Sequence, residues 1–145
     1  VEGSRDDVST LGRELAGVEN YLGILKIRMG ARLEFSVNAS DAAKQLRVPP
    51  MVLQPLVENA IKHGIEPKVG GGRIDVNAEI TDAGARVTVR DNGLGFGVAG
   101  GTSTGTGLAN LKARLKAVSG QAAKLEIHET PGGGVTITLH LPTGK

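Results

Sequence analysis

Residues 48–64 read Val-Pro-Pro-Met-Val-Leu-Gln-Pro-Leu-Val-Glu-Asn-Ala-Ile-Lys-His-Gly. Proline is poorly tolerated in the interior of a helix but is favoured in its first turn. We therefore predict a helix that begins near Pro55 and runs to about Gly64. The residues that share one face of this helix are apolar or small, which predicts that the face packs on a core: Leu53, Leu56, Val57, Ala60 and Gly64.

Three polar side chains lie on the neighbouring face of the same predicted helix. Asn59, Lys62 and His63 are spaced i, i+3 and i+4, so they converge beside the apolar face. The Asn59 carboxamide is a neutral oxygen ligand suited to Mg²⁺ that keeps waters and takes its other ligands from phosphates. Lys62 is suited to neutralising phosphate charge, and His63 to stacking on a base or donating to a phosphate. The alternative is an ordinary solvated helix face.

A second polar segment follows a predicted strand that contains Val87 and Val89. Residues 91–95 read Asp-Asn-Gly-Leu-Gly. A carboxylate at a strand end accepts a hydrogen bond from the exocyclic amine of adenine and repels the carbonyl that guanine carries there, a discrimination worth a few kcal/mol. Gly93 and Gly95 have no Cβ, which lets the backbone approach a ligand closely. The alternative is a plain Asp-Asn-Gly turn.

The third segment, Gly-Thr-Gly-Leu at 105–108, opens a predicted helix that runs to about Val118. Free backbone N–H groups and the helix dipole favour phosphate at such a position. Thr106 is also a good N-cap, which is the alternative interpretation. The residues before this helix include glycines at 97, 100, 101, 105 and 107, which predicts a loop.

Alternating apolar residues elsewhere predict strands. Two such runs flank the turn at 82–84 and predict an antiparallel pair. We expect an α+β fold, a two-layer sandwich of a mixed, mostly antiparallel sheet packed on helices. The alternating residues are Leu33, Phe35 and Val37; Ile74, Val76, Ala78 and Ile80; Val87 and Val89; Leu125 and Ile127; and Val135, Ile137, Leu139 and Leu141.

A heptad pattern precedes the first strand. Its apolar residues recur at spacings of 3 and 4 and end before Gly30: Leu11, Leu15, Val18, Leu22, Leu25 and Met29. The pattern predicts either an amphipathic helix packed on its own domain or the tail of a helical dimerisation hairpin. Gly12, Gly17 and Gly23 weaken it as an isolated helix, so it needs a partner surface.

Composition limits the classes of function. The 145 residues fit one domain, and the net charge of +2 without a Lys/Arg run argues against nucleic acid. The only aromatic residues are Tyr21, Phe35 and Phe96, so the core must be aliphatic. The absence of cysteine excludes disulfides and thiolate metal sites. No apolar run is long enough to span a membrane. Because the chain begins at Val1, we expect it to be part of a longer protein.

Taken together, 48–64, 91–95 and 105–111, with Tyr21-Leu22 before Arg28, resemble the ATP-binding domain of sensor histidine kinases related to LytS and YehU. This domain belongs to the superfamily of gyrase, Hsp90, histidine kinases and MutL. The resemblance covers nearly the whole chain and implies the Bergerat-type ATP-binding fold. It also implies that 1–30 is the end of a dimerisation and phosphoacceptor hairpin and that 31–145 is the ATP-binding catalytic domain.

The resemblance implies a role for each residue of the three segments. Asn59 coordinates Mg²⁺, Lys62 contacts phosphate, His63 flanks the adenine and Asp91 binds its amine. Residues 97–106 match the ATP lid. The pocket and its phosphate loop are shaped by Gly93, Gly95, Gly105, Thr106, Gly107 and Leu108.

One departure separates this chain from its hydrolysing relatives. Gyrase-type and Hsp90-type members carry a water-activating glutamate four residues before the magnesium asparagine, and that position is Pro55 here. Glu58 lies beside Asn59 instead, roughly 100° around the helix, where it would orient the site or act as a base. Transfer to an external acceptor therefore fits better than hydrolysis.

We therefore expect the catalytic part of a protein-histidine kinase that uses ATP and Mg²⁺. None of His63, His128 and His140 fits the acceptor, so the fragment should not autophosphorylate. The expected partners are a phosphoacceptor helix and a response regulator. The parent is expected to be a membrane-anchored homodimer with this portion in the cytoplasm. The alternatives are an ATP-gated clamp or chaperone-type ATPase, a degenerate nucleotide-binding module, and a serine kinase resembling anti-sigma factors.

Overall fold

The computed structural model describes residues 9–48, 52–82, 84–94, 124–130 and 133–142. Its main sheet has five strands in the order β2-β4-β5-β7-β6. They span Leu33–Ala39 (β2), Gly72–Thr81 (β4), Gly84–Asp91 (β5), Lys124–Glu129 (β6) and Val135–Pro142 (β7). Within this part of the chain β2 and β4 pair in parallel and the other neighbours pair antiparallel, which confirms the mixed, mostly antiparallel sheet.

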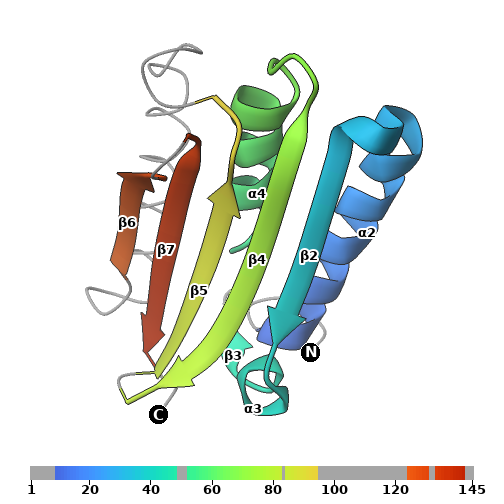
Figure 1. Cartoon of the computed structure of the whole chain (residues 1–145). Coiled ribbons are helices and arrows are strands. Elements are labelled where there is room, and N and C mark those ends of the chain that lie inside the picture. Colours follow the sequence, from blue (N-terminus) through green and yellow to red (C-terminus); the bar gives the residue numbers. More distant parts are fainter. Residues whose placement is uncertain (1–8, 49–51, 83, 95–123, 131–132, 143–145) are drawn as a thin grey trace.

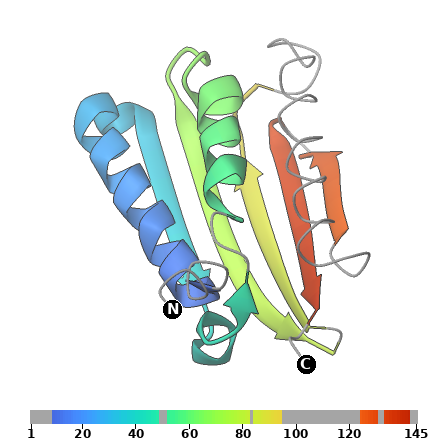
Figure 2. The same ribbon diagram turned by 180° about the vertical axis from the view of Figure 1, so that it is seen from behind.

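The helices cover one face of this sheet, as Figures 1 and 2 show from opposite sides. They are α2 (Leu11–Met29) and α4 (Gln54–Ala60), and a π-helical turn, Ile61–Ile65, continues α4. The smaller elements are a 3₁₀ turn at Gly30–Arg32, the short helix α3 (Asp41–Lys44) and an antiparallel pair formed by β1 (Ser9–Thr10) and β3 (Arg47–Val48). No described helix combines the length and the apolar character that a membrane crossing requires.

Helix α2 packs on its own domain. Thr10 caps its start, because the Thr10 side chain accepts a hydrogen bond from the Arg13 amide, and Gly30 with a φ of 61° ends it. The six heptad residues are all buried: Leu11, Leu15, Val18, Leu22, Leu25 and Met29. This packing favours the first of the two alternatives for the helix. That residues 1–30 end a dimerisation hairpin stays a prediction.

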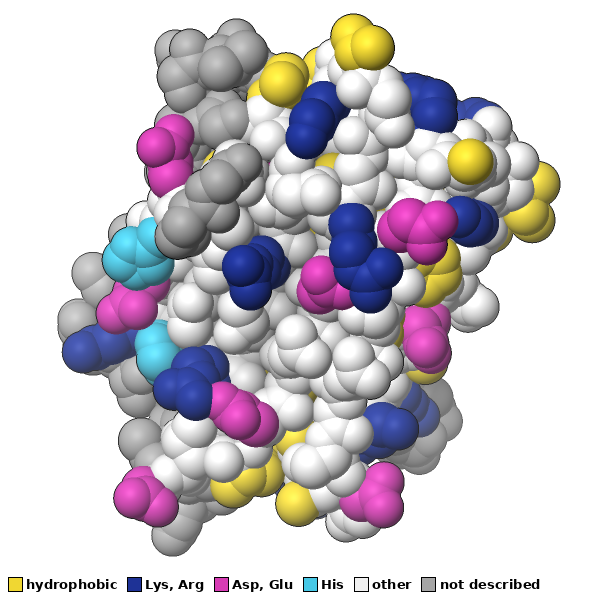
Figure 3. Space-filling model, viewed as in Figure 1, with side chains coloured by type: hydrophobic (Ala, Val, Ile, Leu, Met, Phe, Trp, Pro, Cys, Tyr) yellow, Lys and Arg dark blue, Asp and Glu magenta, His cyan; other side chains and the backbone are white. Residues whose placement is uncertain are grey.

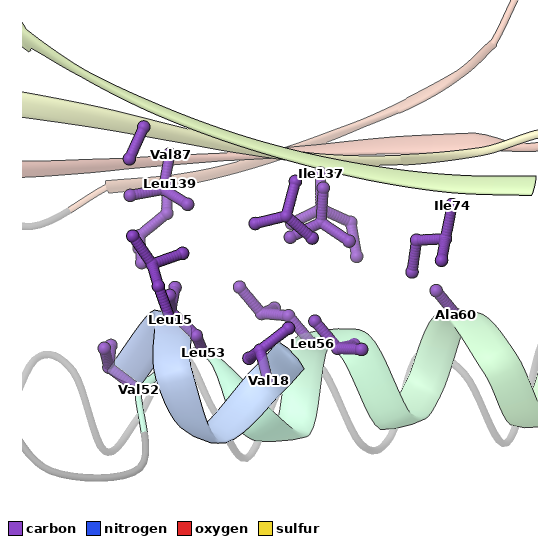
Figure 4. Close-up of a cluster of buried hydrophobic side chains, with 14 of the residues drawn as sticks. Leu15, Val18, Val52, Leu53, Leu56, Ala60, Ile74, Val87, Ile137 and Leu139 are labelled. Carbon is purple, nitrogen blue, oxygen red and sulfur yellow. The ribbon is translucent and has the colours of Figure 1, made fainter. Parts of the chain in front are cut away.

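The core lies between the helices and the sheet and is aliphatic, as the composition predicts. Figure 4 shows Leu15 and Val18 of α2 beside Leu53 and Leu56, with Ile137 and other sheet residues above them. These five side chains are at most 3% exposed. Burial of so many Leu, Ile and Val side chains is the main stabilising contribution to such a layer. The core therefore ties α2 and α4 to one sheet.

The opposite face of the sheet is open and carries charges of both signs, as Figure 3 shows. Nε of Arg73 lies 2.9 Å from Oδ1 of Asp75, and Arg86 pairs with Glu79. His128 and His140 also lie on this side. Their Nε2 atoms are 3.9 and 3.5 Å, respectively, from Oε1 of Glu126. The described part of the face therefore has no purely basic patch, in agreement with the balanced charge of the sequence.

Candidate functional site

The first two polar segments meet at one end of the sheet, on the side that the helices cover. Asn59 lies on α4, and Lys62 and His63 lie on the π-helical turn that follows it. Asp91 ends β5, as predicted. Because successive side chains of a strand alternate, Asp91 shares the helix-facing side with the buried Val89. Gly95 and residues 105–108 lie outside the described residues.

Three side chains on this helix are available to a ligand. Asn59 and His63 are half-buried and Lys62 is exposed. Within the described residues, none of the three side chains makes a hydrogen bond or an ion pair. The Asn59 oxygen therefore fits a Mg²⁺ ion that takes its remaining ligands from water and phosphate. The described residues also hold no cluster of three or more His, Cys, Asp or Glu that could bind a metal alone.

Asp91 is only 3% exposed, although it is ionisable. The Gly93 amide donates a hydrogen bond to its Oδ1 atom at 2.8 Å, and the Val135 amide donates to the same carboxyl group. Burial raises the pKa of Asp91 to about 6, and these two hydrogen bonds and the charge of Lys68 only partly oppose the rise. Such a raised pKa in a carboxyl group beside other polar residues is typical of a functional site.

Close backbone contacts join the two segments. The Leu94 amide donates to the Gly64 carbonyl at 3.0 Å. A Cβ at position 93 would lie 2.1 Å from that same carbonyl oxygen, so Gly93 is required for packing. The structure shows that Gly93 closely approaches the helix. Its predicted close approach to a ligand stays a prediction. The contact fixes where Asp91 lies relative to Asn59 and His63.

Glu58 lies apart from this meeting point. Its side chain is exposed and accepts a hydrogen bond from Nε2 of Gln54 at 3.2 Å. Its partner Gln54 faces α2, because a Cβ at Gly17 of α2 would lie 4.0 Å from the Gln54 Oε1 atom, so Glu58 lies on the side of α4 that faces α2. Burial raises the pKa of Tyr21 on α2, and the charge of Glu58 adds to the rise. A catalytic role for Glu58 stays a prediction.

Sequence reasoning missed several residues around Asp91. Lys68 donates to the Asn92 carbonyl at 2.7 Å, and the Thr130 hydroxyl donates to the Asp91 carbonyl at 3.3 Å. Val135 contributes a backbone amide, which no side-chain pattern reveals. Gly134, just before β7, has a φ of 93°, a backbone conformation that favours glycine. All of these contacts join segments that are distant in the sequence.

A hollow of about 380 Å³ lies at the same end of the sheet. It is lined by Arg73, Asp75, Arg90, Asp91, Asn92, Thr130 and Gly133. Arg90 precedes Asp91 in β5, so its side chain lies on the opposite face of the sheet. This hollow therefore adjoins Asp91 but extends onto the open face of the sheet.

The raised pKa of Asp91 predicts how stability depends on pH. The folded state binds the Asp91 proton more tightly than the unfolded chain, so this group stabilises the domain fully below about pH 4 and the contribution is lost as pH rises through about 6. The wild-type domain is expected to lose up to about 3 kcal/mol relative to Asp91→Asn across this window. Urea denaturation of both proteins from pH 4 to pH 7 measures the difference. A difference that does not change with pH would contradict the prediction.

Comparisons with known proteins find a matching family, similar sequences and similar solved structures. Residues 47–145 match the family described as histidine kinase-, DNA gyrase B-, and HSP90-like ATPase. The chain is 35% identical over 154 residues to the sensor protein LytS of Staphylococcus haemolyticus, covering 99% of this chain and 26% of that protein. It is 36% identical over 145 residues to the sensor histidine kinase/phosphatase LytS of Staphylococcus aureus strain Mu50, covering 92% of this chain and 25% of that protein. The chain thus spans about a quarter of the length of these relatives.

Solved structures show the same fold. The nucleotide-free catalytic domain of histidine kinase ThkA matches with a TM-score of 0.69 and 21% identity, covering 94% of each chain. The histidine kinase domain of the blue-light activated kinase from Erythrobacter litoralis EL346 matches with a TM-score of 0.68 and 20% identity, covering 92% of this chain and 61% of that one. The two-layer α+β architecture expected from the sequence is confirmed.

Proposed function

Because the chain belongs to the family of histidine kinase-, DNA gyrase B- and HSP90-like ATPases, we propose that it binds Mg-ATP and donates the γ-phosphoryl group to a histidine on another segment of a longer sensor kinase. The observation that carries the proposal is the buried Asp91 carboxylate, which the Gly64–Gly93 contact holds next to the helix that bears Asn59, Lys62 and His63. The proposed adenine-binding residue, Asp91, and the proposed phosphate- and magnesium-binding residues, Lys62 and Asn59, thus lie at one end of the sheet.

Each residue has a distinct task in this proposal. The Asp91 carboxylate accepts a hydrogen bond from the adenine amine, and His63 flanks the base. Asn59 holds the magnesium ion, which when bound neutralises charge on the phosphates, and Lys62 adds a positive charge. Positioning and charge neutralisation supply most of the catalysis of phosphoryl transfer. The bond from the γ-phosphorus to the ADP oxygen breaks, a bond to an imidazole nitrogen forms, and ADP leaves.

The chemistry at the start of α4 favours transfer over hydrolysis. Pro55 lies in the first turn of α4 and has no group that could activate water. Glu58 is engaged by Gln54, from which it accepts a hydrogen bond at 3.2 Å. An ATP-gated clamp or chaperone-type ATPase would need a water-activating group in this helix. We therefore place the acceptor outside the domain, on a phosphoacceptor helix of the parent protein.

The fragment itself is expected to bind Mg-ATP without becoming labelled. His63 belongs to the proposed nucleotide site. His128 lies on β6 and His140 on β7, and both side chains are on the open face of the sheet. Incubation with ATP labelled in the γ-phosphate should give no acid-labile, base-stable phosphate on the purified chain, whereas a longer chain with the upstream acceptor helix should become labelled. Phosphohistidine on the fragment would contradict the proposal, and free phosphate without protein label would favour the clamp-type ATPase.

The parent protein is proposed to be a membrane-anchored homodimer that presents this domain in the cytoplasm and passes its phosphoryl group to a response regulator. Support comes from the similarity to the LytS proteins, which are named as a sensor protein and a sensor histidine kinase/phosphatase. Residues 1–30 would be the end of the dimerisation hairpin, and the rest of the hairpin and the anchor would lie in other parts of the parent.

A further inference from the structure

Three glycines from three separate elements surround Asp91. Gly64 lies in the π-helical turn, Gly93 in the loop after β5, and Gly134 just before β7. A Cβ at position 134 would lie 2.0 Å from the Asp91 carbonyl oxygen, and a Cβ at position 93 would lie 2.1 Å from the Gly64 carbonyl oxygen. No real Cβ tolerates such distances, so the backbone of Asp91 and the backbone of Gly64 are both held in place.

Gly64 alone among these glycines faces the reactive end of Asp91. A Cβ at position 64 would lie 2.9 Å from Oδ1, 3.3 Å from Cγ and 3.5 Å from Oδ2 of Asp91. The bare Cα of Gly64 therefore lies against the whole carboxyl group. Since Asp91 is 3% exposed and its Oδ1 accepts from the Gly93 amide, the carboxylate has little room to move away.

The π-helical turn is what brings Gly64 to this place. The Glu66 amide bonds the Ile61 carbonyl at 2.8 Å, five residues earlier, so the turn is wider than an α-helical one. The Gly64 carbonyl accepts from the Leu94 amide instead of from its own helix. Such π turns inside helices are often found at functional sites. Here the turn couples the helix of Asn59 and His63 to the Asp91 loop through the backbone.

We propose that Gly64 is a specificity-determining positioning residue: its missing side chain sets the place of the Asp91 carboxylate that selects a 6-aminopurine over a 6-oxopurine. The inference rests on the proposed function, because it presupposes that Asp91 accepts from the adenine amine. An alanine methyl group at position 64 would push the carboxylate aside, and the hydrogen bond to the amine would be lost. A purine with a carbonyl at that position makes no such bond, so displacing the carboxylate should not weaken its binding.

The test compares the dissociation constants of Mg-ATP and Mg-ITP by calorimetry. Their bases differ only at C6, where the amine is replaced by a carbonyl, and at N1, which carries a proton in ITP. The wild-type chain is expected to prefer ATP by at least about tenfold. In Gly64→Ala the affinity for ATP is expected to fall about tenfold or more while that for ITP stays within about twofold, so the preference disappears. The matched control is Gly23→Ala, a glycine with no atom within 4 Å of an added Cβ, which should keep the preference.

Each outcome bears on a different claim. Gly64→Ala that keeps the wild-type preference, including a parallel loss for both nucleotides, would overturn the role of Gly64 alone. A wild-type chain that binds ATP no better than ITP would overturn the proposed adenine site and with it this inference. Should Gly64→Ala not fold, Asp91→Glu carries the carboxylate one methylene further from the backbone, out of the place beside Gly64, and is expected to lose the same preference. Retention of the preference in Asp91→Glu would overturn the proposal.

Discussion

Asp91→Asn is expected to weaken binding of adenine nucleotides by about a hundredfold. The substitution keeps the shape of the side chain but replaces one acceptor oxygen with a donor NH₂ group and removes the charge. The lost charge-assisted hydrogen bond and the new donor–donor contact with the adenine amine together cost about 3 kcal/mol. Calorimetric titration with Mg-ATP measures the loss, and an unchanged affinity would remove Asp91 as the adenine-binding residue.

The same variant is expected to remain folded at neutral pH, which separates a binding effect from unfolding. The difference between the ordinary pKa of 3.8 and the value of about 6 corresponds to about 3 kcal/mol, which is the cost of keeping this buried carboxyl ionised at pH 7. An uncharged amide avoids that cost but pairs badly with one of the two backbone amides. The domain should therefore be at least as stable as the wild type in urea at pH 7. If Asp91→Asn were instead less stable than the wild type by several kcal/mol, the buried charge would not destabilise the fold as predicted.

Asn59→Ala is expected to abolish the magnesium-dependent kinase activity of a longer chain that carries the acceptor helix. Losing the carboxamide ligand should lower the rate at saturating ATP by at least about a hundredfold, equivalent to about 3 kcal/mol in the activation barrier. No described residue hydrogen bonds the Asn59 side chain, so its truncation should leave the fold intact. Initial rates of autophosphorylation across a magnesium titration give the result.

Asn77→Ala is the matched control for this experiment. Asn77 is an exposed asparagine of β4, and it lies on the opposite side of the sheet from the buried Val76. Its truncation should leave the rate and the magnesium dependence unchanged. If Asn59→Ala behaves like Asn77→Ala, the magnesium ligand must be sought elsewhere in the chain.

The sheet and the helices were predicted well because their signals are local. Alternating apolar residues indicate a half-buried strand whichever strand it pairs with. The pairing of Val76 with Val89 confirms the predicted antiparallel hairpin. Pro55 likewise marked the first turn of α4 correctly. The heptad pattern of α2 identified a buried face but not its partner, since a 3–4 spacing describes equally a helix on its own domain and a helix in a coiled coil.

The surroundings of Asp91 could not be predicted in the same way. No residue pattern distinguishes the π-helical turn at Ile61–Ile65 from a continuing α-helix, because the wider turn is stabilised by the bond from Leu94 to Gly64 across the fold. The raised pKa of Asp91 depends on burial by distant elements. Lys68, Thr130 and Val135 lie far from Asp91 in the sequence and are brought near it by the tertiary fold.

The sequence by itself determined which residues carry the chemistry and on which kinds of element they lie, because helix starts, strand alternation and side-chain donors are properties of neighbouring residues. Only the tertiary structure decided how these residues meet. It packed α2 on its own domain, brought Gly64 against the Asp91 carboxyl group and left Glu58 on the side of α4 that faces α2. These facts depend on contacts between segments distant in the chain, where a difference of one methyl group decides whether two backbones can touch.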